Sequence, residues 1–187
     1  MDQENIIDKL QAKIKSQEEQ IAKFEAALEY ESLPDRVKDA RNAQSKLDEA
    51  LNEDSIKSVM YALREGADVN RMIGRHFPIV YASLYCKPDI VEALLQNGAD
   101  VNVRNEGRTS LQHAAWMGYT DIVSVLLDDP NIDLNAIDND GNTALHLSVF
   151  NDCKDVYEML IDVGADTSIV NKDAETASDI YSKHLHQ

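Results

Sequence analysis

The nonapeptide Gly141-Asn142-Thr143-Ala144-Leu145-His146-Leu147-Ser148-Val149 carries the most structural information in this chain. It opens on an Asp-Gly turn signal and continues into a run with helix-forming character. A related segment, Gly107-Arg108-Thr109-Ser110-Leu111-Gln112-His113-Ala114-Ala115, lies upstream. Its alanine pair allows a second helix to approach closely. The residues that follow, 120–127, place their apolar side chains on one helical face. Each stretch therefore predicts a helix–turn–helix unit.

The same unit recurs along the sequence. Gly66-Ala67-Asp68-Val69-Asn70 returns as Gly98-Ala99-Asp100-Val101-Asn102, and more loosely at residues 131–135 and 164–168. Upstream of each copy, two apolar residues are separated by sixteen positions: Leu47 and Leu63, Ile79 and Leu95, Leu111 and Leu127, and Leu145 and Ile161. A helix–turn–helix unit cannot bury its apolar face alone, so such units are expected to stack into an array.

These motifs resemble the ankyrin repeat, with its glycine turn, Thr-Pro-Leu-His-like opening, alanine pair and apolar second helix. The resemblance covers residues 41–187. It implies an all-α solenoid with four repeats at about 41–70, 71–102, 103–135 and 136–168, followed by a C-terminal cap at 169–187. It also implies that Thr143 and His146 make structural hydrogen bonds.

The second unit departs most from this pattern. Phe77 stands in place of the expected threonine, and Arg75 occupies the position of Gly107. We expect Gly74, one residue earlier, to supply the bend of the turn.

A heptad pattern marks the first thirty residues, with the apolar and Gln positions alternating three and four apart: Ile7, Leu10, Ile14, Gln17, Ile21, Phe24 and Leu28. This spacing predicts a coiled-coil helix over residues 1–31. Residues 32–40 form a linker and the start of a capping helix, because Pro34 ends one helix and suits the first turn of the next. Three alternatives remain: pairing with a second copy of the chain, folding back onto the array, and pairing with a foreign helix.

The resemblance further implies that a partner docks on the concave face, formed by the turn tips and first helices. The two positions after the alanine pair are surface-variable in the family. Here they are mostly large and apolar in the central units: Leu84 and Tyr85, Trp116 and Met117, and Phe150 and Asn151. Such side chains are enriched at the centre of interfaces. The alternative is that they lie between helices and support the stack.

The turn tips supply the polar part of the expected binding surface. In the third and fourth units we expect contacts from Arg104, Glu106, Arg108, Asn139, Asp140 and Asn142. The tips of the second and third units are basic within an acidic chain, which would suit an acidic partner segment.

Composition narrows the function classes. The net charge is −16, so nucleic acid and anionic membranes are not expected as partners. A secretory signal and a run of apolar residues long enough to cross a bilayer are both missing from the sequence, which favours a cytoplasmic or nuclear location.

Phosphate loops, nucleophile elbows and paired Cys-x-x-Cys motifs are also absent from the sequence. We therefore expect no enzyme, no cofactor and no metal. The expected function is that of an adaptor or scaffold in protein–protein interaction, with a stoichiometric enzyme inhibitor or regulatory subunit as the alternative.

Overall fold

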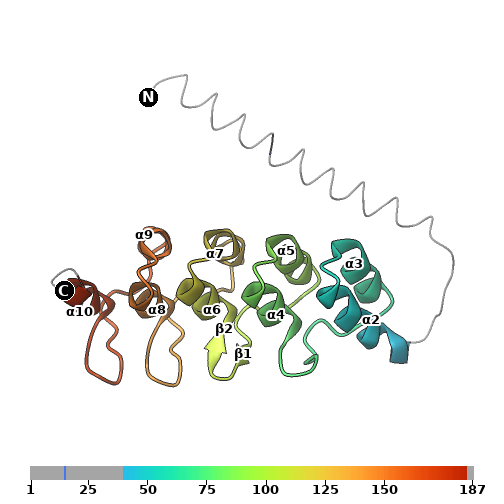
Figure 1. Cartoon of the computed structure of the whole chain (residues 1–187), viewed down its shortest axis with the longest axis horizontal. Coiled ribbons are helices and arrows are strands. Elements are labelled where there is room, and N and C mark those ends of the chain that lie inside the picture. The colour runs from blue at the N-terminus through green and yellow to red at the C-terminus, as the bar shows by residue number, and fades with distance from the viewer. Residues whose placement is uncertain (1–14, 16–39, 185–187) are drawn as a thin grey trace.

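The computed structural model describes residues 40–184, together with Lys15. Within residues 40–184 the chain forms antiparallel helix pairs followed by one further helix, each joined to the next by a loop that projects from the array (Figure 1). The helices are α2 (Ala40–Asn52) with α3 (Ile56–Arg64), α4 (Pro78–Leu84) with α5 (Pro88–Gln96), α6 (Ser110–Met117) with α7 (Thr120–Leu127), α8 (Ala144–Phe150) with α9 (Lys154–Asp162), and α10 (Ala177–His184).

The helices stack in two layers. An inner layer consists of α2, α4, α6, α8 and α10, and an outer layer of α3, α5, α7 and α9; neighbours within each layer are in contact. The connecting loops extend from the inner layer on the side away from the outer helices (Figure 1). We call these loops finger 2 (residues 70–77), finger 3 (102–109), finger 4 (135–143) and finger 5 (168–176). The sequence expectation of a mostly helical, stacked array is confirmed.

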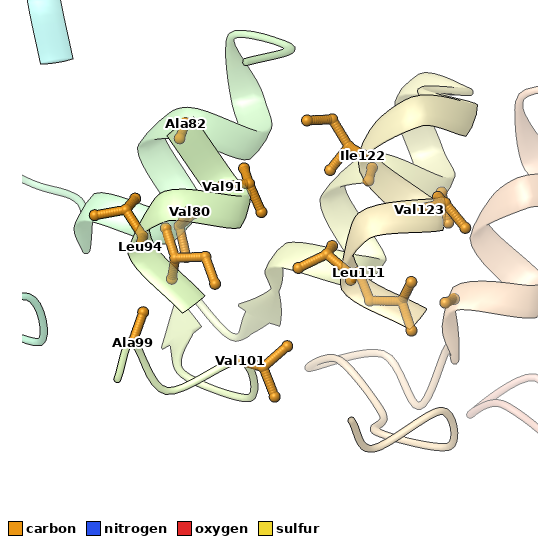
Figure 2. Packing of buried hydrophobic residues seen from close by; sticks show 14 of the residues in the cluster. Val80, Ala82, Val91, Leu94, Ala99, Val101, Leu111, Ile122 and Val123 are labelled. Atoms are coloured by element: carbon orange, nitrogen blue, oxygen red, sulfur yellow. The ribbon is translucent and has the colours of Figure 1, made fainter. Parts of the chain in front are cut away.

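A continuous apolar core lies between the two layers and between successive units. Leu111 and Leu145 on the inner helices are each 1 % exposed, and Ile122 on α7 is completely buried. Ala114 and Ala115 are also completely buried, so the alanine pair does allow helices to approach closely. Figure 2 shows the core crossing from one unit to the next, with Val91 of α5 facing Ile122 of the following unit.

Capping fixes where the inner helices begin. Thr109 and Thr143 precede α6 and α8, and each accepts a hydrogen bond from the backbone three residues later. The side chains of Gln112 and His146 bond back to the threonine backbone, which completes a capping box in both units. The structural role expected for Thr143 and His146 is therefore confirmed.

The expectation of an all-α fold was wrong in finger 3. Strands β1 (Arg104–Asn105) and β2 (Arg108–Thr109) pair antiparallel, with Arg104 opposite Thr109 and Asn105 opposite Arg108. The two turn residues, Glu106 and Gly107, both have positive φ, at 51° and 89°. Two consecutive positive φ values suit a tight hairpin whose twist matches that of the strands. Finger 2 closes similarly, through an isolated bridge between Ile73 and His76.

Glycine supplies several of the bends where the backbone is left-handed. Gly74 has φ of +61°, so it supplies the bend of the turn in the second unit, as expected from the sequence. The glycines expected after the outer helices also have positive φ: Gly66, Gly98 and Gly164. Gly141 in finger 4 is more constrained, because a Cβ atom there would lie 3.1 Å from the backbone nitrogen of Lys172 in finger 5.

An asparagine ladder fixes the spacing of the units. The Oδ1 atoms of Asn70, Asn102 and Asn135 accept hydrogen bonds from the backbone N–H of Asp100, Asp133 and Asp166, at 2.8, 2.8 and 2.9 Å. Each bond joins the loop after one outer helix to the loop after the next. The fingers are thereby held at a regular distance, which gives the exposed surface of the array a defined shape.

The heptad positions from Ile7 to Leu28 and the linker at 32–39 lie outside the described residues, so the coiled coil stays a prediction. Among the described residues, none of the helices is long and apolar enough to cross a membrane.

Candidate functional site

Large apolar side chains gather at the C-terminal ends of three adjacent inner helices. We call this set the apolar row: Leu84, Tyr85, Trp116, Met117 and Phe150. Tyr85 is 60 % exposed, Met117 45 % and Phe150 37 %, while Leu84 and Trp116 are partly buried. Asn151, the sixth predicted position, is exposed. Exposed large apolar side chains at repeated positions of one surface are typical of binding sites.

Two aromatic contacts organise the apolar row. The ring centroids of Trp116 and Phe150 are 6.3 Å apart and tilted by 50°, so the structure brings these residues from α6 and α8 together. Asn151 donates a hydrogen bond from Nδ2 to the carbonyl oxygen of Trp116 at 2.7 Å. Tyr85 instead contacts Tyr81 of its own helix, with centroids 4.6 Å apart.

Tyr81 was missed by the sequence analysis. Its hydroxyl donates to Oδ1 of Asn52 at 2.6 Å, and the ammonium of Lys87 lies 5.7 Å from its ring centre. Partial burial and the neighbouring Tyr85 raise the pKa of Tyr81. The signal was present in the sequence, because Tyr81 and Tyr85 are four residues apart and therefore share a helical face.

Basic and aromatic side chains connect the fingers to the apolar row. In finger 3, the guanidinium of Arg108 lies 5.5 Å from the ring centre of Trp116, and its Nε donates to Oδ2 of Asp138 at 3.2 Å. In finger 2, the rings of His76 and Tyr81 are 6.4 Å apart. Arg104 donates from its guanidinium to the carbonyl oxygen of Ile137 in finger 4. The fingers and inner helices thus form one surface in the second and third units.

The other predicted tip residues differ in accessibility. Glu106, Asn139 and Asp140 are exposed at the ends of fingers 3 and 4. Asn142 is only 7 % exposed, and its Oδ1 accepts a hydrogen bond from Nδ2 of Asn171 in finger 5 at 3.1 Å. Its side chain therefore ties two fingers together and offers a partner little surface.

A further set of exposed positions follows the asparagine ladder and was also missed. Met72, Ile137 and Val170 are 47 %, 47 % and 53 % exposed. Met72 and Ile137 lie two residues after the ladder residues Asn70 and Asn135, and Val170 lies two residues after Ser168, the equivalent position of the next unit. Arg104 is the equivalent residue in finger 3. The constant offset could have identified this set from the sequence. It adds exposed apolar side chains on fingers 2, 4 and 5.

Burial shifts the pKa values of His113, His146 and Cys153. Burial, followed by the charge of Arg108, lowers the pKa of His113, and burial also lowers that of His146. Burial raises the pKa of the Cys153 thiol, which disfavours the reactive thiolate. Residues 40–184 contain no group of three or more His, Cys, Asp or Glu side chains placed to hold a metal ion.

Comparison with known proteins places these features in one family. A family model described as ankyrin repeats (3 copies) matches residues 47–138 and 105–171. The chain is 39 % identical over 124 residues to the ankyrin repeat protein FPV219 of Fowlpox virus (strain NVSL), covering 66 % of this chain and 28 % of that protein. It is 34 % identical over 112 residues to alpha-latrocrustotoxin-Lt1a of Latrodectus tredecimguttatus, covering 59 % and 8 %. For BCL-6 corepressor-like protein 1 of Homo sapiens, the identity is 31 % over 115 residues, covering 61 % and 6 %. The matched region is thus a small part of each relative.

Proposed function

Because the chain belongs to the ankyrin-repeat family, we propose that it is an adaptor or scaffold whose protein partner docks on the apolar row and the adjoining fingers. Ankyrin repeats are generally protein–protein interaction modules. The observation that carries the proposal for this chain is the exposure of Tyr85, Met117 and Phe150 on three adjacent units. Aromatic and methionine side chains contribute strongly to interface cores, especially near the centre of a patch.

The apolar row has polar surroundings along the array. At the corresponding positions of the first unit stand Asn52 and Glu53, which are both exposed. The fifth unit has Lys183 there, also exposed. An apolar centre with a polar rim is the usual anatomy of a protein interface. A purely structural role would not need the most exposed side chains of the row to be apolar.

We expect the variant Tyr85→Ser/Trp116→Ser/Phe150→Ser to lose at least tenfold in affinity for its partner, because it removes the aromatic anchors of the surface. The measurement is affinity capture from lysate of the source cells with wild type and variant side by side, followed by titration of the captured partner. A captured enzyme that loses its activity would select the inhibitor alternative over the adaptor.

Folding must be separated from binding in this test, since Trp116 and Phe150 also contact each other. Far-UV circular dichroism and thermal melting show whether the triple variant is folded. The variant Tyr85→Ser/Met117→Ser provides a second measurement, because it changes only the most exposed side chains of the row. If a specific partner binds wild type and both folded variants equally, the apolar row is not the interface.

We further propose that residues 1–31 pair two copies of the chain. The support is the heptad spacing from Ile7 to Leu28, with isoleucine at three of the four a positions. Two linked arrays would bind a multivalent target more tightly than one array.

Deleting residues 1–31 is expected to halve the solution mass at micromolar concentration, because the apolar seam that holds two chains together is removed. Light scattering coupled to size exclusion measures this, with Ile14→Lys/Ile21→Lys in the full chain as a control that leaves the length unchanged. A full-length chain that already has the mass of one copy would disprove the dimer.

A further inference from the structure

Charge is distributed very unevenly along the array. Residues 71–117 contain five Lys or Arg and four Asp or Glu, whereas residues 118–184 contain three and fourteen. Residues 71–117, which run from finger 2 to the end of α6, are therefore close to neutral or slightly basic within a chain of net charge −16. The fourth and fifth units are strongly acidic. A partner lying along the apolar row would meet a much more acidic surface at one end than at the other.

Four of the five basic side chains in residues 71–117 lie on the fingers, and the fifth, Lys87, precedes α5. Arg71 and Arg75 belong to finger 2, and Arg104 and Arg108 to finger 3. Arg71 and Arg75 are exposed. Their side chains have no hydrogen bond or ion pair with any of the described residues. Unpaired guanidinium groups retain all their donors for a carboxylate on a partner.

Two of these arginines neighbour aromatic residues, Arg75 along the sequence and Arg108 in space. Arg75 is next to His76, whose ring lies 6.4 Å from that of Tyr81, and Tyr81 in turn contacts Tyr85. Arg108 lies 5.5 Å from the ring of Trp116. In both units, the basic groups lie on the finger and the aromatic side chains lie on the inner helix. The combination fits a ligand in which acidic side chains stand beside a large apolar one.

From this juxtaposition we infer that the partner presents an acidic peptide segment with an aromatic or aliphatic anchor. The anchor contacts Trp116 and Phe150, and the carboxylates face Arg71, Arg75, Arg104 and Arg108. This inference rests on the proposed function, since it names the chemistry of the partner that docks there. The partner's acidic end lies over fingers 2 and 3, because the fourth and fifth units would repel it.

Nucleic acid also carries negative charge and stacks on aromatic rings. The fourteen acidic residues of residues 118–184 oppose it, because a phosphate backbone crossing the array would run directly into their field. A short acidic peptide can stay over fingers 2 and 3 and avoid most of that repulsion.

The test uses the full-length chain and a displayed library of random 12-residue peptides as the probe. We expect enriched peptides to contain an aromatic or leucine residue with two or more Asp or Glu on one side of it. Synthetic copies are then titrated by fluorescence anisotropy at low and high salt. Arg71→Glu/Arg75→Glu should weaken binding about tenfold or more at low salt and less at high salt, because these exposed charges are screened.

A matched control separates local charge from net charge. Lys57→Glu/Lys154→Glu makes the same change in total charge on exposed residues of the outer helices α3 and α9. We expect it to change the affinity by less than about twofold at moderate salt, because the sites lie on the other layer of the array.

The outcomes distinguish this inference from the proposed function. Peptides that lose binding with Trp116→Ser but bind Arg71→Glu/Arg75→Glu like wild type would overturn the acidic partner and leave the apolar row as the interface. Peptides that bind Trp116→Ser and Arg71→Glu/Arg75→Glu as tightly as wild type would count against both this inference and the proposed function. A library that yields no enriched sequence would do the same. A fluorescent oligothymidine of twenty nucleotides that binds more tightly than the best peptide would also overturn the inference, in favour of nucleic acid.

Discussion

Leu145→Ala is expected to lower the free energy of unfolding by about 2–5 kcal/mol. Leu145 lies on α8, is 1 % exposed and belongs to the core that links successive units. Truncation removes buried apolar area and leaves a cavity, because neighbouring units held by the asparagine ladder can close only part of the space. Urea denaturation, followed by circular dichroism and by fluorescence of the single tryptophan, Trp116, measures the loss.

Ile161→Ala provides the matched control for this experiment. Ile161 stands sixteen residues after Leu145 in the repeat pattern but is 36 % exposed on α9. The same truncation there should cost much less, since fewer buried contacts are lost. A loss of only a few tenths of a kcal/mol for Leu145→Ala would contradict the repeat register. Coincidence of the two spectroscopic probes checks that a single transition is being measured, because repeat arrays can lose cooperativity.

The comparison between Leu145 and Ile161 also shows what the sequence pattern could predict. Constant spacing identified both positions as landmarks of the repeat, and periodicity correctly placed Leu145 in the core. The spacing could not predict that Leu145 is buried whereas Ile161 is partly exposed. Accessibility on an outer helix depends on how the neighbouring units cover it, and α10 has no following outer helix within the described residues.

For the candidate site, the sequence likewise predicted the positions of the residues but not the contacts between their side chains. Equivalent offsets located the residues of the apolar row, because each unit repeats the same backbone. The pairing of Trp116 with Phe150 and of Tyr81 with Tyr85 depends on side-chain rotamers and on the separation of helices, which spacing does not contain. The hairpin of finger 3 and the burial of Asn142 likewise depend on contacts between adjacent loops. The approach of Arg108 to Trp116 needs both the finger and the helix in place.

His146→Ala is the second substitution expected to have a large effect on stability. His146 is 1 % exposed, and its Nδ1 accepts a hydrogen bond from the backbone N–H of Thr143 at 3.2 Å. Its Nε2 donates to the carbonyl oxygen of Glu175 in finger 5 at 3.1 Å. Alanine leaves these buried groups without partners, which costs about 1–3 kcal/mol, and the missing ring adds a cavity penalty.

His146→Gln should retain most of this stability, because the neighbouring unit already uses glutamine at the same position. Gln112 accepts a hydrogen bond from the backbone N–H of Thr109 at 2.9 Å. Its Nε2 donates to the carbonyl oxygens of Ala136 and Asn142, at 2.8 and 2.9 Å. Glutamine therefore satisfies both the capping box and the next finger. Equal destabilisation by alanine and glutamine would show that the hydrogen bonds of His146 contribute little.

The two variants should also differ from wild type in their response to pH. Burial lowers the pKa of His146 in the folded chain below its ordinary value of 6.5. The imidazole of His146 therefore binds a proton more readily in the unfolded chain than in the folded chain. The contribution of neutral His146 to the free energy of unfolding is complete above about pH 6.5, and it declines as the pH falls through that value towards the lowered pKa. The melting temperature of the wild type should therefore fall further than that of His146→Gln between pH 7.5 and 5.0.

A smaller pH response remains in the variant, because burial also lowers the pKa of His113. Asp166 and Asp179 do not contribute in this range, since their pKa values are lowered from 3.8. Identical melting-temperature shifts in wild type and His146→Gln would assign the acid sensitivity to other groups.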